Sequence, residues 1–403
     1  MRVVICGAGI AGLALAQRMT TLGADVVLVE KAPGPRDQGY MIDFFGPGYD
    51  AAEAMGLLPR LVALGYPVDE VNYLDESGRR RSRLSYHKVA RAVGGRLLSI
   101  MRPDLELALR EQVAGKADLR FGSGIKCIEN LANGVAVTLS DNTVLDADLL
   151  VGADGIHSTV RRLVFGPERD YLRYLGFHTA AYIFHDAEIH RQLRNRFCLT
   201  DSVGREMGFY GLRDGRVAVF AVHRAVDPTV PEDTARAVRE AYSTLGWIVP
   251  RSLAGCPDTS EVYYDQVAQI EIPQWHRERV VLLGDACQAV SLLAGQGASL
   301  AIAGAYVLAA KLATEGSIEA ALTGYQTLWR PTVEDKQRVA RSGAQWFLPL
   351  SRRRLWSRRV ALKLMQVPGL GRFLGTALIG KSNATIENLS HDSREPSWRA
   401  PQW

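Results

Sequence analysis

The order of apolar and polar positions at the start of the chain predicts a parallel βαβ unit. Residues 2–6 form a short apolar run, a glycine-rich turn follows, and apolar residues then recur with helical spacing from Leu13 to Met19. A second apolar run extends from Asp25 to Val29. Strand, turn, helix and strand in this order are typical of two parallel strands joined by a crossover helix.

Further along the chain, the apolar pattern alternates between helical and strand periods. Helical spacing predicts helices over 49–64, 103–114, 231–247 and 297–314. Residues 117–151 alternate as in an antiparallel meander that ends in the apolar strand 147–151, and 279–283 is another apolar strand. These segments extend the region that begins with the βαβ unit.

The middle of the chain has a different pattern, with short runs of β-forming residues at 179–184, 206–212 and 217–223. An Asp-Gly turn at 213–215 predicts a hairpin between the last two runs. We therefore expect an α/β fold with a Rossmann-like nucleotide-binding domain formed by 1–170 and 276–330. An antiparallel β-sheet domain of 171–275 is inserted into it, and a helical region and tail follow at 331–403.

Composition and charge fit a globular enzyme. The chain has 403 residues, of which 47% are hydrophobic and 23% charged, and its net charge is +5. We expect no nucleic-acid partner, because that would require a basic face with stacking aromatic residues close to the chemical motifs. The densest basic cluster lies instead near the C-terminus, and it consists of Arg352, Arg353, Arg354, Arg358, Arg359 and Lys363.

The cysteines and the apolar runs indicate where in the cell the protein is expected. The five cysteines form no CxxC pair, so we expect no disulfide framework, no metal site and a cytoplasmic protein. No uninterrupted apolar run reaches the roughly 18 residues of a membrane span, and the early first strand leaves no room for a signal peptide. The C-terminal region is basic and amphipathic, which fits either a membrane surface or packing on the protein. We expect packing with outward arginines, and no stable membrane association.

The first chemical motif is the glycine-rich turn Gly7-Ala8-Gly9-Ile10-Ala11-Gly12. Gly7 permits the tight turn, Gly9 lets a pyrophosphate approach the backbone, and Gly12 lets the helix pack on the strand. Glu30 ends the second strand, where a carboxylate can accept ribose hydroxyls. A negative charge there disfavours the 2′-phosphate of NADP, whereas FAD and NAD are both open at this step.

Two later motifs each follow an apolar strand. Val151-Gly152-Ala153-Asp154-Gly155 is a strand that ends in an Asp-Gly turn, which is either a simple connection or a second phosphate-side loop. Leu282-Leu283-Gly284-Asp285-Ala286 leads to Ala294-Gly295-Gln296-Gly297 at the start of a long helix. An Asp beyond the carboxyl end of a strand can accept a ribityl or ribose hydroxyl, and the helix N-terminus can hold negative charge on a ring.

Taken together, the three motifs resemble the GxGxxG, DG and GD fingerprints of the class A flavin monooxygenases, the para-hydroxybenzoate hydroxylase-like family. The resemblance covers about residues 1–330. The segments Gly39-Tyr40-Met41-Ile42-Asp43 and Met101-Arg102-Pro103-Asp104-Leu105 are similar to the tetracycline-inactivating and polyketide-tailoring branches. Arg102 precedes a predicted helix, as the family arginine does.

The resemblance implies a set of FAD-contacting residues. These are Gly7, Gly9, Ile10, Ala11, Gly12, Glu30, Lys31, Arg102, Asp154, Gly284, Asp285, Gly295, Gln296, Gly297 and Ala298. It also implies that NADPH or NADH binds transiently, since the chain has no second GxGxxG. The reduced flavin would then form a C4a-hydroperoxide with O2 and hydroxylate an aromatic or polyketide-like small molecule. A monomer or homodimer is expected.

One segment departs from the family pattern. Gln288, Ser291 and Leu292 stand where the family has a histidine and prolines. This departure leaves a non-redox FAD-binding cyclase open as an alternative. A flavin-dependent dehydrogenase without oxygen transfer is a separate alternative.

The substrate side gives weaker signals. Asp43, Tyr210, Arg213 and His223 are candidates for substrate binding, as polar or aromatic side chains on or near the predicted sheet. No catalytic residue is assigned, because an acidic enol substrate needs no base.

Overall fold

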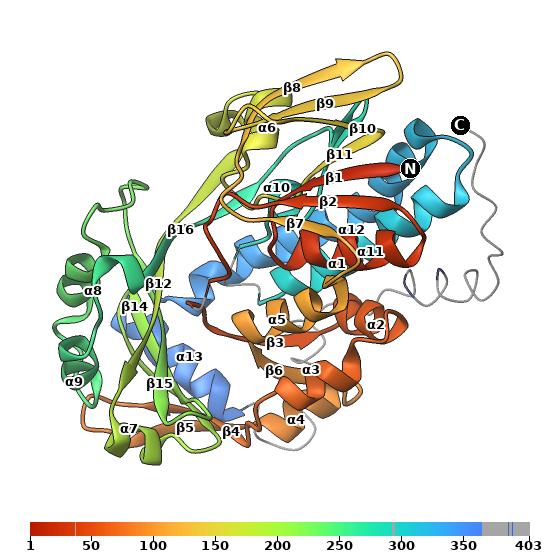
Figure 1. The fold of residues 1–403 in the computed structure, drawn as a ribbon. Coiled ribbons are helices and arrows are strands. Elements are labelled where there is room, and N and C mark those ends of the chain that lie inside the picture. Colours follow the sequence, from red (N-terminus) through yellow and green to blue (C-terminus); the bar gives the residue numbers. More distant parts are fainter. Residues whose placement is uncertain (37, 292–294, 365–385, 387–388, 390–403) are drawn as a thin grey trace.

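The computed structural model describes residues 1–36, 38–291, 295–364, 386 and 389 (Figure 1). It contains one β-sheet of six strands, one of seven, and two smaller sheets of three and two strands. The mixture of helices and sheets confirms the expected α/β class. The division into domains at residues 170, 276 and 331 stays a prediction.

The six-stranded sheet carries the glycine-rich turn. Its order is β17 (His276–Arg277), β18 (Val280–Leu282), β11 (Leu149–Gly152), β1 (Arg2–Cys6), β2 (Asp25–Val29) and β7 (Asp118–Arg120). All neighbours pair in parallel except β17 with β18. Helix α1 (Ile10–Thr21) connects β1 to β2, so the predicted βαβ unit is confirmed.

Buried helices pack around this sheet. Helix α11 (Gly297–Thr314) lies against α1 and α2 (Pro47–Ala54), and the backbone N–H of Gly48 donates to Ser299 Oγ at 2.8 Å. By length and hydropathy alone, α11 could cross a membrane, which differs from the expectation of no such segment. However, 67% of its apolar window is buried inside the fold, as in the core helix of a globular protein.

The seven-stranded sheet is antiparallel apart from one pair. Its order is β16 (Tyr263–Ile270), β12 (Leu172–His185), β15 (Arg216–Arg224), β14 (Arg205–Gly211), β13 (Arg196–Ser202), β4 (Glu70–Leu74) and β5 (Arg80–Ser85). The predicted hairpin joins β14 to β15, with Gly215 at φ 86°. Strands β4 and β5 were not predicted, because their charged residues obscure the strand pattern.

Helices α7 (Ala187–Gln192), α8 (Thr234–Tyr242) and α9 (Val249–Ala254) bury one face of this sheet. The smaller sheets are β8 (Ile125–Leu131), β9 (Gly134–Leu139) and β10 (Val144–Ala147), and the pair β3 (Met41–Phe45) and β6 (Leu97–Met101). The meander predicted over 117–151 is therefore correct only in its middle, because β7 and β11 at its two ends belong to the six-stranded sheet.

Two predicted helices have different limits in the structure. The segment 49–64 is not one helix, because α2 ends at Ala54 and α3 (Leu58–Leu64) follows a turn at Gly56, whose φ is 70°. Helix α8 is shorter than predicted, since Asp233 caps its start by accepting from the backbone N–H of Arg236 at 2.9 Å. The other helical elements are α4 (Tyr86–Ala92), α5 (Arg102–Val113), α6 (Thr159–Val164), η1 (Glu168–Asp170), η2 (Thr259–Glu261), α10 (Asp285–Gln288) and α12 (Ile318–Phe347).

The C-terminal helix α13 (Arg352–Leu364) packs against β5, in agreement with the expected packing on the protein. Its orientation differs from the prediction. Arg358 is only 2% exposed and forms ion pairs with Asp201 and Glu206, whereas Trp356 is 68% exposed. The helix thus presents an arginine to the sheet, because two buried carboxylates there require a positive charge.

Candidate functional site

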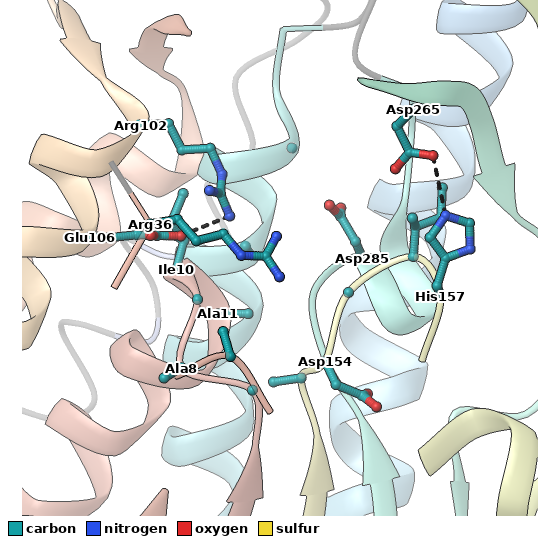
Figure 2. Close-up of a pocket in the computed structure, with 18 of the residues that line it drawn as sticks. Ala8, Ile10, Ala11, Arg36, Arg102, Glu106, Asp154, His157, Asp265 and Asp285 are labelled. Atoms are coloured by element: carbon teal, nitrogen blue, oxygen red, sulfur yellow. Dashed lines mark hydrogen bonds and ion pairs between the residues drawn. The ribbon is translucent and has the colours of Figure 1, made fainter. Parts of the chain in front are cut away.

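A cavity of about 620 Å³ lies between the carboxyl ends of the parallel strands and the larger sheet, at its edge strand β16 and the neighbouring strand β12. Figure 2 shows Arg36 and Arg102 on one side of it, His157 and Asp265 on the other, and Asp285 between them. Most residues predicted to contact FAD line this cavity. They are Gly7, Gly9, Ile10, Ala11, Glu30, Lys31, Arg102, Asp154, Asp285, Gly295, Gly297 and Ala298.

The turn after β1 is shaped by close backbone contacts. Gly7 has φ 107°, and a Cβ on it would lie 2.3 Å from the carbonyl oxygen of Ala153. Gly12 does not line the cavity; a Cβ there would lie 1.9 Å from the carbonyl oxygen of Gly7. Gly9 precedes α1 without a side-chain cap, so N–H groups of the first helical turn are available to an anion in the cavity.

Glu30 fixes this turn as well as facing the cavity. Its carboxylate accepts from the backbone N–H of Ala8 at 3.0 Å and from that of Ala32 at 2.9 Å. A carboxylate offers about four lone-pair positions, so two remain for ribose hydroxyls. Lys31 follows it in the cavity wall.

Arg102 lies opposite the glycine-rich turn, at the start of α5. Its guanidinium forms an ion pair with the buried carboxylate of Glu106, with Nη2 and Oε1 2.8 Å apart. Burial lowers the pKa of Arg102, but Glu106, Tyr40, Tyr263 and Asp285 outweigh burial and raise it overall. The side chain therefore stays cationic beside a helix N-terminus, which is an arrangement that suits a diphosphate.

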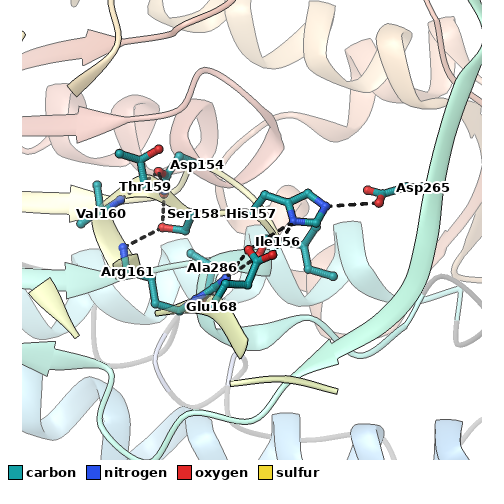
Figure 3. Close-up of polar contacts among 10 residues, drawn as sticks. All are labelled: Asp154, Ile156, His157, Ser158, Thr159, Val160, Arg161, Glu168, Asp265 and Ala286. Atoms are coloured by element: carbon teal, nitrogen blue, oxygen red, sulfur yellow. Dashed lines mark hydrogen bonds and ion pairs between the residues drawn. The ribbon is translucent and has the colours of Figure 1, made fainter. Parts of the chain in front are cut away.

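The Asp-Gly turn after β11 is built around the Asp154 carboxylate (Figure 3). Asp154 accepts from Ser158 Oγ at 2.5 Å and from the backbone N–H groups of Thr159 and Val160 at 2.6 and 3.1 Å. These bonds cap α6 and hold the turn in the cavity wall. The first task of Asp154 is thus to shape the turn, which leaves little of its acceptor capacity for a cofactor.

Two residues of this motif have contacts that were not predicted from the sequence. Arg161 is fully buried and donates to the carbonyl oxygens of Ile156 and Ala286 at 2.6 and 2.9 Å, so it joins the second motif to the third (Figure 3). His157 lines the cavity and contacts Asp265 on β16. Their spacing after Asp-Gly was visible in the sequence, but their partners are distant along the chain.

The third motif brings a carboxylate and two glycines to the cavity. Gly284 lies behind the wall, where a Cβ would come 2.6 Å from Ala11 Cβ, so it permits close packing on α1. Burial raises the pKa of Asp285, and the facing Arg102 opposes that shift. Among the described residues, a Cβ on Gly297 would meet only Asp285 Oδ1, at 3.9 Å, and one on Gly295 would meet nothing within 4 Å. The space beside these glycines can hold a flat ring.

Gln296 differs from its two neighbours, because it is buried and does not line the cavity. Of the segment that departs from the family pattern, Gln288 points into the core and donates to the Tyr325 hydroxyl, while Ser291 lines the cavity. Leu292 lies outside the described residues.

The wall on the side of the larger sheet is aromatic and mostly neutral. The ring of Tyr40 lies 5.6 Å from that of Phe220 and 6.0 Å from that of Tyr263. Thr179 and Gln266 add a hydroxyl and an amide to this wall. Burial raises the pKa of Tyr40 to about 12, so its phenol stays protonated at neutral pH.

The four residues predicted to bind substrate do not line this cavity. Tyr210 is buried, and its hydroxyl accepts from the backbone N–H of Met41. Arg213 donates to the carbonyl oxygen of Gly65 and stacks 4.3 Å above the ring of Tyr66. Both side chains are engaged in structural contacts, which the sequence pattern could not distinguish from substrate contacts.

His223 and Asp43 are likewise engaged elsewhere. His223 faces α8, where its Nδ1 lies 3.1 Å from the Tyr242 hydroxyl, and burial lowers its pKa to about 4. Asp43 accepts from Tyr86 and Ser99, at 2.5 and 2.7 Å. Burial raises its pKa, while these two hydrogen bonds oppose the rise.

The chemistry of the cavity wall suits the groups of FAD. It offers a helix N-terminus and Arg102 for a diphosphate, Glu30 for a ribose, Asp285 for a ribityl chain, and open space beside Gly295 and Gly297 for the ring.

Comparison with known proteins agrees with this geometry. The family model described as "FAD binding domain" matches residues 1–333. A 2-heptyl-3-hydroxy-4(1H)-quinolone synthase of Pseudomonas aeruginosa is 32% identical over 318 residues, which are 77% of this chain and 80% of that protein. A flavin-dependent monooxygenase from an unknown prokaryotic organism is 29% identical over 344 residues, covering 83% of this chain and 87% of that protein.

Solved structures show the same fold. The tetracycline destructase Tet(51) superimposes with a TM-score of 0.79 at 26% identity, covering 95% of this chain and 99% of that one. HpxO of Klebsiella pneumoniae, solved with FAD and uric acid, has a TM-score of 0.79 at 23% identity, covering 94% of this chain and 96% of that one. The chain belongs to the FAD binding domain family, and it is an FAD-dependent monooxygenase of the class A type.

Proposed function

We propose that this enzyme uses NADPH or NADH and O2 to hydroxylate an aromatic or polyketide-like small molecule. One observation carries the proposal. A single cavity joins an anion site at the start of α1 to an aromatic wall on the larger sheet, with open space beside Gly295 and Gly297 between them. Cofactor and substrate would therefore meet in the middle of that cavity.

Different residues around the cavity would contact different parts of FAD. The first turn of α1 and Arg102 would hold the diphosphate, Glu30 the ribose, and Asp285 the ribityl chain. When bound, FAD supplies the redox chemistry between NAD(P)H, O2 and the substrate. The protein would orient the ring between the start of α11 and the larger sheet.

The wall opposite the glycines favours a planar substrate of low charge. Tyr40 and Tyr263 provide ring faces, and Gln266 and Thr179 provide hydrogen-bonding groups. The one carboxylate of β16 in this wall, Asp265, already contacts His157. Two of the similar proteins, the quinolone synthase and the tetracycline destructase, are named for a quinolone and for tetracycline.

The altered segment at Gln288 and Ser291 left a non-redox cyclase open, but the similarity to flavin-dependent monooxygenases gives it no support. Gln288 donates to Tyr325 in the core and Ser291, with φ 90°, lines the cavity, so these positions lack the histidine and prolines of the family pattern. A flavin-dependent dehydrogenase is the other alternative that the sequence left open, and no feature of the described residues favours it. Monomer or homodimer, cytoplasmic location and the domain limits stay predictions.

The first experiment is a turnover assay under ¹⁸O2. Purified protein with FAD and NAD(P)H would be offered a panel of quinolones, phenols and tetracyclic polyketides. We expect one class of compound to accelerate NAD(P)H oxidation and to gain ¹⁸O from the gas. Turnover without NAD(P)H consumption would favour the cyclase, and product formed without O2 would favour the dehydrogenase; either result contradicts the hydroxylase.

A further inference from the structure

His157 is the one imidazole in the cavity wall among the described residues, and both of its nitrogens are occupied (Figure 3). Nδ1 lies 3.0 Å from Glu168 Oε1, and Nε2 lies 3.2 Å from Asp265 Oδ1. A neutral imidazole carries only one N–H, so it would turn a lone pair toward one of the two carboxylates. The two carboxylates therefore favour the imidazolium, in which both ring nitrogens donate.

His157 and its partner Asp265 belong to different parts of the fold. His157 follows the Asp-Gly turn of the six-stranded sheet, and Asp265 belongs to β16, the edge strand of the larger sheet. The same Asp265 oxygen also accepts from the backbone N–H of Gln266, at 2.8 Å. An ion pair at this point therefore connects the cofactor side of the cavity to the strand that presents Tyr263 and Gln266.

We propose that His157 is a positioning residue, which as a cation holds the Asp-Gly turn and strand β16 at a fixed separation across the cavity. It acts through Asp265 and Glu168, and it has no step in the chemistry. The inference rests on FAD binding and not on the hydroxylation proposed above.

The surroundings of His157 favour its cationic form. Hydrogen bonding to Asp265 and then to Glu168 raises its pKa to about 9, although partial burial opposes the rise. The other charges nearby are Arg161, which donates to Glu168 at 3.1 Å, and Asp154 at the start of the turn. Because the folded pKa lies above the ordinary 6.5, the connection is complete below pH 6.5 and is lost as the pH rises through about 9.

The test is FAD binding to the apoprotein between pH 6.5 and pH 10, measured by flavin fluorescence. Since the pair is partly exposed, we expect the FAD Kd of the unmodified protein to rise only about threefold, with a midpoint near pH 9. His157→Gln should bind FAD with the weaker Kd already at pH 7 and lose that midpoint. Asp265→Asn should behave in the same way, and the double variant should be no weaker than either single variant.

The matched control is His87→Gln, because His87 is exposed on α4 and lies outside the cavity. Its FAD Kd should change with pH as that of the unmodified protein does. Ionisation of the flavin itself should affect the Kd of all variants alike. Thermal unfolding of each apoprotein reports folding separately. The proposal is overturned if His157→Gln keeps the pH midpoint, or if only its KM for NAD(P)H changes while its FAD Kd does not. If the enzyme did not hydroxylate any compound tested, these FAD-binding measurements would still decide the role of His157.

Discussion

The glycines around the cavity have two separate physical roles. Gly7 and Gly12 make contacts that no Cβ could share, since a Cβ on either residue would lie 2.3 or 1.9 Å, respectively, from a backbone oxygen. Gly295 and Gly297 instead border open space. The first pair is required by the fold of the turn, and the second pair leaves room for a ligand.

Replacing Gly12 with alanine tests the first role. The added methyl group would collide with Gly7, so we expect the free energy of unfolding to fall by about 1–3 kcal/mol and FAD binding to weaken with it. Urea denaturation of the apoprotein measures the first effect. Gly316→Ala is the control, because a Cβ there meets nothing within 4 Å and its φ is not positive. Equal stability of the two variants would contradict this view of the turn.

The elements differ in how well the sequence predicts them. The βαβ unit and the hairpin at Gly215 follow from local periodicity and turn chemistry, so they could be predicted. Strands β4 and β5 could not, because β4 enters the larger sheet by pairing with β13, more than 100 residues away in the chain, and β5 pairs in turn with β4. The three motifs predicted the cavity wall for the same local reason, whereas the contacts of Asp43 and His223 depend on distant partners.

Helix α13 also depends on distant partners that the local sequence does not reveal. Its basic composition did not show that Arg358 points inward to Asp201 and Glu206. Replacing Arg358 with methionine keeps an unbranched apolar stem but removes the guanidinium, which leaves Glu206 without its cation. We expect the free energy of unfolding to fall by about 3–5 kcal/mol, as for other broken buried ion pairs. Arg353→Met, at an exposed site of the same helix, is the control. Calorimetry at pH 7.5 compares them, and matching melting temperatures would show that the buried pair contributes little.

The two large sheets have different tasks in the folded protein. The parallel strands deliver all three motifs to one edge, where Arg161 joins the second motif to the third. Strands β12 and β16 of the larger sheet close the cavity from the other side with Thr179, Tyr263 and Gln266. The sequence motifs therefore predicted residues of the cavity wall on the side of the parallel strands, whereas none of the four residues predicted for the substrate side lines the cavity.

Every role given to the cavity requires that FAD lies in it with its ring beside Gly297. Titration of the purified apoprotein with FAD, followed by visible absorbance, measures this binding. We expect a single FAD per chain, and loss of that uptake in Gly297→Leu, whose side chain would fill the open space, while Gly316→Ala binds normally. A protein that takes up no FAD, or a Gly297→Leu variant that binds FAD as tightly as the unmodified chain, would contradict this placement of the cofactor.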